Sequence, residues 1–152
     1  MNKLAEPGLE LVAKPRRTTV GCWIAAVAVL AVCVFVATAL RGTTEGGGVF
    51  HAADQYTMVG LGILAAAGIM MFARPRVWIS DKGIRIRNVI GAYDLPWEVV
   101  KSVSFPKGAS WAMLELADDD VVSIMAIQAV DRDHALAAVK RVRAGLARHR
   151  GE

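Results

Sequence analysis

The sequence predicts a two-helix transmembrane hairpin followed by a mainly β domain, in which antiparallel strands form a bent sheet or split barrel capped by a C-terminal amphipathic helix. Three observations support this fold class. Two long runs near the start carry no charged side chain. Short stretches with alternating apolar and polar residues recur between residues 77 and 127, and an amphipathic stretch follows them.

The two uncharged runs are residues 18–40 and residues 56–73. A helix of about 20 residues crosses a hydrocarbon layer about 30 Å thick, so both runs predict membrane spans. A secretory signal peptide is a competing interpretation of the first run, because residues 37–39 look like a small-residue cleavage site. We favour the span, since the run exceeds the roughly 7–15 apolar residues of such a signal and a second apolar run follows.

The distribution of basic residues predicts the orientation of the hairpin. The connector 41–55 contains one basic residue, Arg41, whereas the outer flanks of both spans are basic. Cationic flanks stay on the cytoplasmic side. We therefore expect a multi-pass plasma-membrane protein with a cytoplasmic tail at 1–17, an external loop at 41–55 and a cytoplasmic domain at 74–152. The predicted membrane-flanking residues are Arg16, Arg17, Arg74 and Arg76.

Small residues within the spans predict that the two helices pack on each other. Gly21 and Ala25 in the first span, and Gly62 and Ala66 in the second, stand four residues apart. This spacing lets helices approach closely in a membrane.

The β domain begins in the stretch VWISDKGIRIRN. Its central residues 81–83, Asp-Lys-Gly, separate two short runs of branched residues, as in a hairpin turn. Successive side chains of a strand point to opposite faces. We therefore expect Ile84 and Ile86 on a buried face, and Arg85 and Arg87 on a solvated one.

Four further strands are expected in the stretches IGAYDLPWEVV, VKSVSF, WAMLEL and VVSIMAI, which lie between residues 90 and 127. The first of these stretches holds a strand and then a turn at Leu95 and Pro96. Trp97, which follows this turn, is expected in the core.

The final stretch, DRDHALAAVKRVRAGLARHR, has the pattern of an amphipathic helix of about four turns. Asp131 or Asp133 is the expected N-cap. The apolar stripe comprises Leu136, Val139, Val142 and Leu146. We expect this helix to close the open end of the sheet.

Several of these features together resemble a known family. They are the motif DKGIRIRN, the residues LPW before an acidic residue and a valine pair, and the apolar strand before the last helix. Their order resembles the small bacterial PH domains of actinobacteria, of the low molecular weight protein antigen 6 type, which two membrane helices usually precede. The resemblance covers Val77 to Arg148 and the hairpin, and it implies a PH-like domain. The family usually has a glycine in the turn where this chain has three aspartates, residues 118–120.

No constellation in the sequence predicts catalysis. The histidines His51, His134 and His149 are scattered, and none stands in a motif with a serine or cysteine nucleophile. The aspartates 118–120 are expected to form a solvated turn rather than a metal site. We therefore expect a protein that is not an enzyme and that has no metal, no other cofactor and no nucleic-acid ligand.

Lys82, Arg85 and Arg87 form the candidate binding site. A similar Lys-x-x-Arg-x-Arg arrangement holds inositol phosphate headgroups in eukaryotic PH domains, so the resemblance implies an anionic phospholipid as ligand. The alternative is that these side chains only fill the solvent face of a half-buried strand. Our leading hypothesis is a membrane-anchored PH-like module that tethers or assembles a membrane protein partner at the cytoplasmic face, and a lipid headgroup sensor is the second hypothesis.

Overall fold

The computed structural model describes residues 8–39 and 51–151. The chain divides into two compact units. The first, here called the β domain, combines the residues up to Arg17 with those from Arg74 onward, and the second, the helical hairpin, comprises Thr18–Ala73. Of the predicted external loop, only residues 51–55 lie within the described part of the chain.

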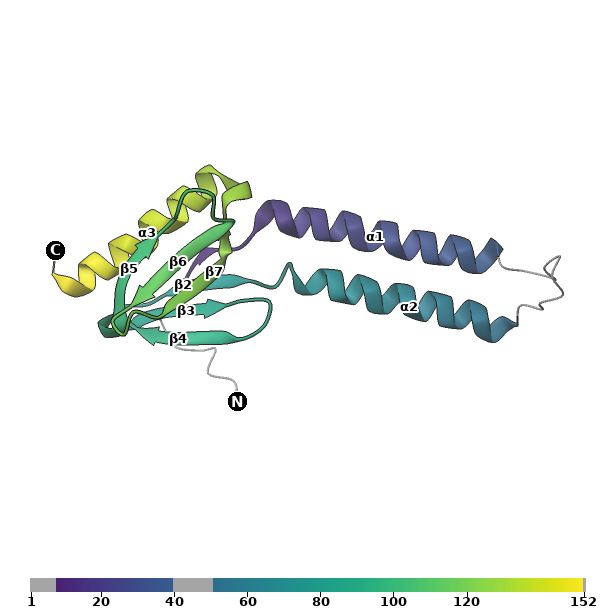
Figure 1. Cartoon of the computed structure of the whole chain (residues 1–152), viewed down its shortest axis with the longest axis horizontal. Coiled ribbons are helices and arrows are strands. Elements are labelled where there is room, and N and C mark those ends of the chain that lie inside the picture. Colours follow the sequence, from purple (N-terminus) through teal and green to yellow (C-terminus); the bar gives the residue numbers. More distant parts are fainter. Residues whose placement is uncertain (1–7, 40–50, 152) are drawn as a thin grey trace. The chain divides into compact units, whose positions relative to one another are not determined.

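Two antiparallel sheets form the β domain (Figure 1). The first sheet has the order β1-β2-β3-β4, with strands at Glu10–Ala13, Arg76–Ile79, Gly83–Arg87 and Ala92–Pro96. The second has the order β5-β6-β7, with strands at Val100–Ser104, Trp111–Leu116 and Val121–Gln128. The helix α3 (Asp133–Arg150) follows and lies against β1, β5 and β7. The predicted fold class is confirmed.

Strand β1 was not predicted, because we had assigned residues 1–17 to a tail. It pairs with β2 in antiparallel register, with Glu10 opposite Ile79 and Leu11 opposite Trp78. Val12 points to the other face and is only 9% exposed. Since β1 precedes the helical hairpin and β2 follows it, the hairpin is inserted between two neighbouring strands of one sheet.

The side-chain alternation predicted for β3 is confirmed. Ile84 and Ile86 are buried, whereas Arg85 and Arg87 lie on the opposite face. The same alternation along β2 to β7 supplies most of the core. The largest buried side chains from these strands are Val77, Ile84, Ile86, Leu114, Ile124 and Ile127.

Trp97 lies in this core, as predicted, and is 2% exposed. Its ring Nε1 donates a hydrogen bond of 2.9 Å to the carbonyl oxygen of Ser80. The predicted turn before it lies two residues later than expected: Leu95 and Pro96 still belong to β4, and the chain turns in the short 3-10 helix η1 (Trp97–Val99).

Helix α3 is longer than predicted, and three of the four residues predicted for its apolar stripe, Val139, Val142 and Leu146, are buried. Leu136, expected in the apolar stripe, is 57% exposed. The buried face also includes the small residues Ala135, Ala138 and Gly145, which let the helix axis lie close to the sheet. The N-cap prediction was also wrong. Arg132 occupies that position, with a φ of 42° and no capping side-chain hydrogen bond.

Two arginines of α3 cover the outer edge of β5. The Nε of Arg143 donates to the carbonyl oxygen of Val103 at 3.0 Å, and the Nη2 of Arg150 donates to that of Lys101 at 2.7 Å. Unpaired backbone groups at a sheet edge invite pairing with another chain. These side chains therefore close one edge of the second sheet.

The helical hairpin consists of α1 (Arg16–Ala39) and α2 (Ala52–Met71), and the first two residues of α1 belong to the β domain. Both helices are long and apolar enough to cross a membrane. Helix α2 begins earlier than predicted, and the backbone N–H of His51 donates to Asp54 Oδ2 at 2.9 Å in its first turn. Large apolar side chains are exposed along both helices, including Val20, Trp23, Ile24, Phe35, Leu61, Ile63 and Leu64.

Gly62 of α2 packs closely against α1. A Cβ at this position would lie 2.7 Å from Cys33 Cβ and 3.4 Å from Leu30 Cδ1. The predicted packing role is therefore confirmed for Gly62. It is wrong for Gly21, where an added Cβ would meet nothing within 4 Å.

We predict that Gly62→Ala destabilises the hairpin by about 1–3 kcal/mol, because the added methyl overpacks the contact with Cys33. Gly60→Ala is the matched control. Its Cβ would meet nothing within 4 Å, and the better helix propensity of alanine should stabilise it by up to about 1 kcal/mol. Thermal unfolding of the full chain in detergent micelles measures both. Equal midpoints for the two variants would contradict the packing assignment.

Candidate functional site

The structure places the three predicted site residues along one hairpin but gives them different environments. Lys82 is exposed in the turn between β2 and β3. Arg85 forms a two-point ion pair with Asp94 of β4, its Nη2 donating to Asp94 Oδ2 at 2.8 Å and its Nε to Asp94 Oδ1. The Arg85 side chain is only 15% exposed. Its charge is therefore largely balanced within the sheet.

Arg87 lies in a different electrostatic setting. It stands directly opposite Arg76 in the register of β2 and β3. Like charges placed opposite each other in a sheet repel. An anion between the two guanidinium groups would relieve this repulsion, so Arg76, predicted as a membrane flank, joins Arg87 in the candidate site.

A hollow of about 250 Å³ lies beside the turn. Lys82 and Arg85 line it together with Asp94, whereas Arg87 does not. The hairpin therefore presents two cationic places, one at each end of β3, rather than the single cluster that the spacing suggested.

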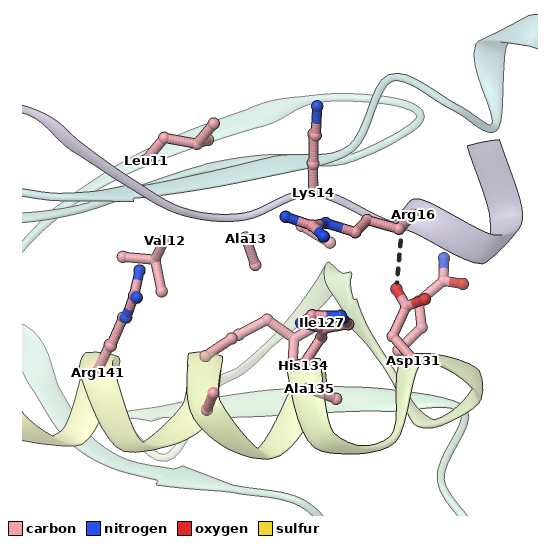
Figure 2. A pocket seen from close by; sticks show the side chains of 14 residues that line it. Leu11, Val12, Ala13, Lys14, Arg16, Ile127, Asp131, His134, Ala135 and Arg141 are labelled. Atoms are coloured by element: carbon pink, nitrogen blue, oxygen red, sulfur yellow. Dashed lines mark hydrogen bonds between the residues drawn. The ribbon is translucent and has the colours of Figure 1, made fainter. Parts of the chain in front are cut away.

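A second cavity, of about 220 Å³, lies between β1, β7 and α3 (Figure 2). Its apolar lining includes Val12, Ile127 and Ala138, and it shares no lining residue with the hollow beside Lys82. The polar side chains at its rim come from distant parts of the chain: Lys14, Arg16, Gln128, Asp131, His134 and Arg141.

Sequence reasoning missed this second cavity. Arg16 was named only as a membrane flank, and Arg141 was assigned to no site. One local signal was available: His134 and Arg141 are seven residues apart, so they lie on one face of α3 two turns apart. Nothing local pointed to β1 as the opposite wall.

Comparison with known proteins identifies the family. Residues 74–144 match the family described as Bacterial PH domain. The uncharacterized protein Rv1417 of Mycobacterium tuberculosis (strain H37Rv) is 40% identical over 141 residues, which cover 93% of this chain and 91% of that protein. The uncharacterized protein Mb1452 of Mycobacterium bovis matches with the same identity and coverage. No solved structure matches.

The chain belongs to the bacterial PH domain family. Membership suggests a non-catalytic interaction module. Within residues 8–39 and 51–151, no group of three or more His, Cys, Asp or Glu side chains could hold a metal ion.

The turn 118–120 contains a residue in a conformation that glycine adopts easily. Asp119 has a φ of 65°, in the left-handed region that glycine adopts most easily and aspartate tolerates. Its Oδ1 also accepts a bond of 2.7 Å from Lys101 Nζ.

Asp131 has a role that differs from the one predicted. It is 7% exposed, and its two carboxylate oxygens accept hydrogen bonds from the backbone N–H groups of Arg16, at 3.2 Å, and Arg17, at 3.1 Å. These are the first two residues of α1. Instead of capping its own helix, the carboxylate satisfies the free N–H groups at the start of another.

We predict that Asp131→Ala costs the PH domain about 0.5–2 kcal/mol, the usual loss for an N-cap. Hydrogen exchange at the amides of Arg16 and Arg17 should become faster, because those N–H groups lose their acceptor. Asp133→Ala is the control, since Asp133 is exposed and stands two residues away. Unchanged exchange at both amides in Asp131→Ala would rule out the cap.

Proposed function

We propose that this protein is a non-enzymatic, membrane-anchored PH-like module that tethers or assembles a membrane protein partner at the cytoplasmic face of the plasma membrane. The two apolar helices and the family membership support this proposal. From the sequence resemblance we further propose that the chain is one of the actinobacterial members of the low molecular weight protein antigen 6 type. The predicted domain boundaries and the cytoplasmic position of both termini form part of the proposal.

The pairing of β1 with β2 is the observation that carries the proposal. These strands stand on either side of the helical hairpin in the chain, yet they are neighbours in one sheet. If α1 and α2 cross a bilayer, the chain must leave it on the side where it entered. The basic flanks Arg16, Arg17, Arg74 and Arg76 favour the cytoplasm as that side.

Anchoring supplies the mechanism of tethering. A domain held at the bilayer meets partners in the same membrane at a higher effective concentration than a free domain would. This gain requires no additional contact, and it depends on the hairpin remaining in the membrane.

The edge strand β4 is the surface we assign to the partner. It is the last strand of the first sheet, and four of its five residues are exposed. Helix α3 covers the opposite edge strand, β1, and its arginines cover β5. Ile90, beside β4, is 85% exposed, and Tyr93 is 43% exposed. An extended segment of the partner could add to β4 through main-chain hydrogen bonds.

We predict that the full chain stays in the membrane fraction after alkaline carbonate extraction. A variant in which a short Gly/Ser turn replaces residues 18–73 should be soluble, because the replaced segment holds both apolar helices while β1 and β2 remain present. Proximity labelling from the C-terminus should mark membrane proteins with the full chain and lose them with the variant.

Ile90→Lys tests whether the partner binds at the edge strand β4. After purification of the full chain in mild detergent, this variant should recover less of the labelled partner, and its unfolding midpoint should not fall. Val121→Lys is the control, because Val121 is 55% exposed at the start of β7. Carbonate-extractable full chain, or a chain that purifies alone, would contradict the proposal.

The second candidate function is an anionic headgroup sensor that uses Lys82, Arg85 and Arg87. The opposed pair Arg76 and Arg87 favours it, since this pair brings two cations together without a carboxylate partner among the described ion pairs.

We predict that Arg87→Gln and Lys82→Gln each weaken binding of the hairpin-deleted variant to phosphatidylglycerol vesicles about fivefold, since one basic residue near an anionic surface contributes about 1 kcal/mol. Sedimentation with vesicles measures this binding. The hairpin-deleted variant must retain β1, because β1 completes the first sheet. Lys107→Gln, in the exposed turn before β6, is the control, and equal losses in all three variants would leave only nonspecific attraction.

A further inference from the structure

We propose that the cavity between β1, β7 and α3 binds a phosphate-bearing anion. It is separate from the basic hairpin considered above, and the proposal does not depend on the tethering function. The argument uses the walls of the cavity, its charge and its size.

The walls combine a buried apolar surface with cationic groups at the rim. Val12 of β1, Ile127 of β7 and Ala138 of α3 are 9%, 1% and 3% exposed. Arg16 enters from the junction of β1 and α1, and Arg141 enters from α3. Figure 2 shows the Arg141 guanidinium pointing toward Val12 and that of Arg16 lying beside Lys14 and Ala13. The two guanidinium groups thus approach the cavity from separate elements.

The lining carries more positive than negative charge. Lys14, Arg16 and Arg141 are cationic, and Asp131 is the one carboxylate among the lining residues. Both oxygens of Asp131 already accept backbone N–H groups, from Arg16 and Arg17. The carboxylate is therefore engaged at the start of α1 rather than with the guanidinium groups.

The cations of the rim have weak partners or none among the described ion pairs. Arg141 has Glu10, with Nη1 and Oε1 separated by 3.8 Å and both side chains about 60% exposed. A solvated pair at that distance contributes little. Lys14 and Arg16 take part in none of the ion pairs found within the described residues. An anion in the cavity would supply the missing counter-charge.

The size of the cavity restricts the ligand. At about 220 Å³ it is smaller than the roughly 300–1,000 Å³ of pockets for drug-sized molecules. It equals the volume of about seven waters in the liquid, each occupying about 30 Å³. A phosphoryl group with a short polar substituent fits this volume.

Arginine matches the oxyanions phosphate and carboxylate for a geometric reason, and a phosphate has enough oxygens to pair with two arginines. The planar guanidinium group of arginine donates two parallel hydrogen bonds to two oxygens of one phosphate. Arg16 and Arg141 can each provide such a pair from opposite walls, and His134, two turns from Arg141 on α3, lines the same space. A phospholipid headgroup and a free phosphate compound offer the same chemistry.

The test uses the full chain, labelled with 15N, in phosphatidylcholine nanodiscs. Inorganic phosphate is added against chloride at matched ionic strength, and the amide resonances of Val12, Ile127 and Ala138 are followed. We expect shifts that saturate, and an apparent Kd at least tenfold weaker in Arg141→Gln, equivalent to about 1.4 kcal/mol. Lys140→Gln is the matched control: it removes one charge from the neighbouring residue, which does not line the cavity.

A second arm identifies the source of the phosphate. Nanodiscs containing phosphatidylglycerol should shift the same three amides without added phosphate if the ligand is a lipid headgroup. Shifts with inorganic phosphate alone would indicate a soluble compound, and either result supports the site. The proposal is overturned if neither probe shifts these amides, or if Arg141→Gln and Lys140→Gln weaken binding equally. Arg87→Gln, on the basic hairpin, should leave the shifts unchanged.

Discussion

The β domain depends on the packing of the buried Trp97 side chain. Its indole stands at the turn between the two sheets, with its N–H bonded to the carbonyl of Ser80 between β2 and β3. Helix α3 meets the same ring at Gly145, where a Cβ would come within 2.9 Å of Cζ2. One side chain therefore links the first sheet, the start of the second sheet and the last helix. A glycine at the contact and the alanines beside it bring α3 close enough to cover β1 and β5.

Helix α3 also forms one wall of the second cavity. Because α3 lies against β1 and β7, its polar residues His134 and Arg141 face the strand that leads into α1. Asp131, just before α3, bonds to the first N–H groups of α1. The first residues of α1 and the residues around the start of α3 thus lie at one site within the β domain. A ligand bound there would contact residues that lead directly into the predicted membrane span, which connects the inferred anion site with the proposed anchoring.

Patterns that repeat over a few residues were sufficient to predict much of the fold. The alternation around Ile84 and Ile86, the strand at 111–116 and the buried Trp97 follow from such patterns and agree with the structure. Predictions about which side chains contact each other succeeded less well. Spacing grouped Arg85 with its neighbours, but the register of β3 against β4 pairs it with Asp94. Asp131 has the residue type of an N-cap, yet the helix it caps begins more than a hundred residues earlier in the chain.

The sequence by itself determined the two apolar helices, the strand-rich domain and its final amphipathic helix, because these depend on local periodicity and on uncharged length. Only the tertiary structure decided that β1 belongs to the sheet, that Arg76 stands opposite Arg87 and that Arg16 and Arg141 line one cavity. A four-residue strand such as β1 has too few residues for a distinct pattern of alternation. Its stability comes from pairing with β2. Residues 16 and 141 line one cavity only when the chain folds, so no window of neighbouring residues contains both.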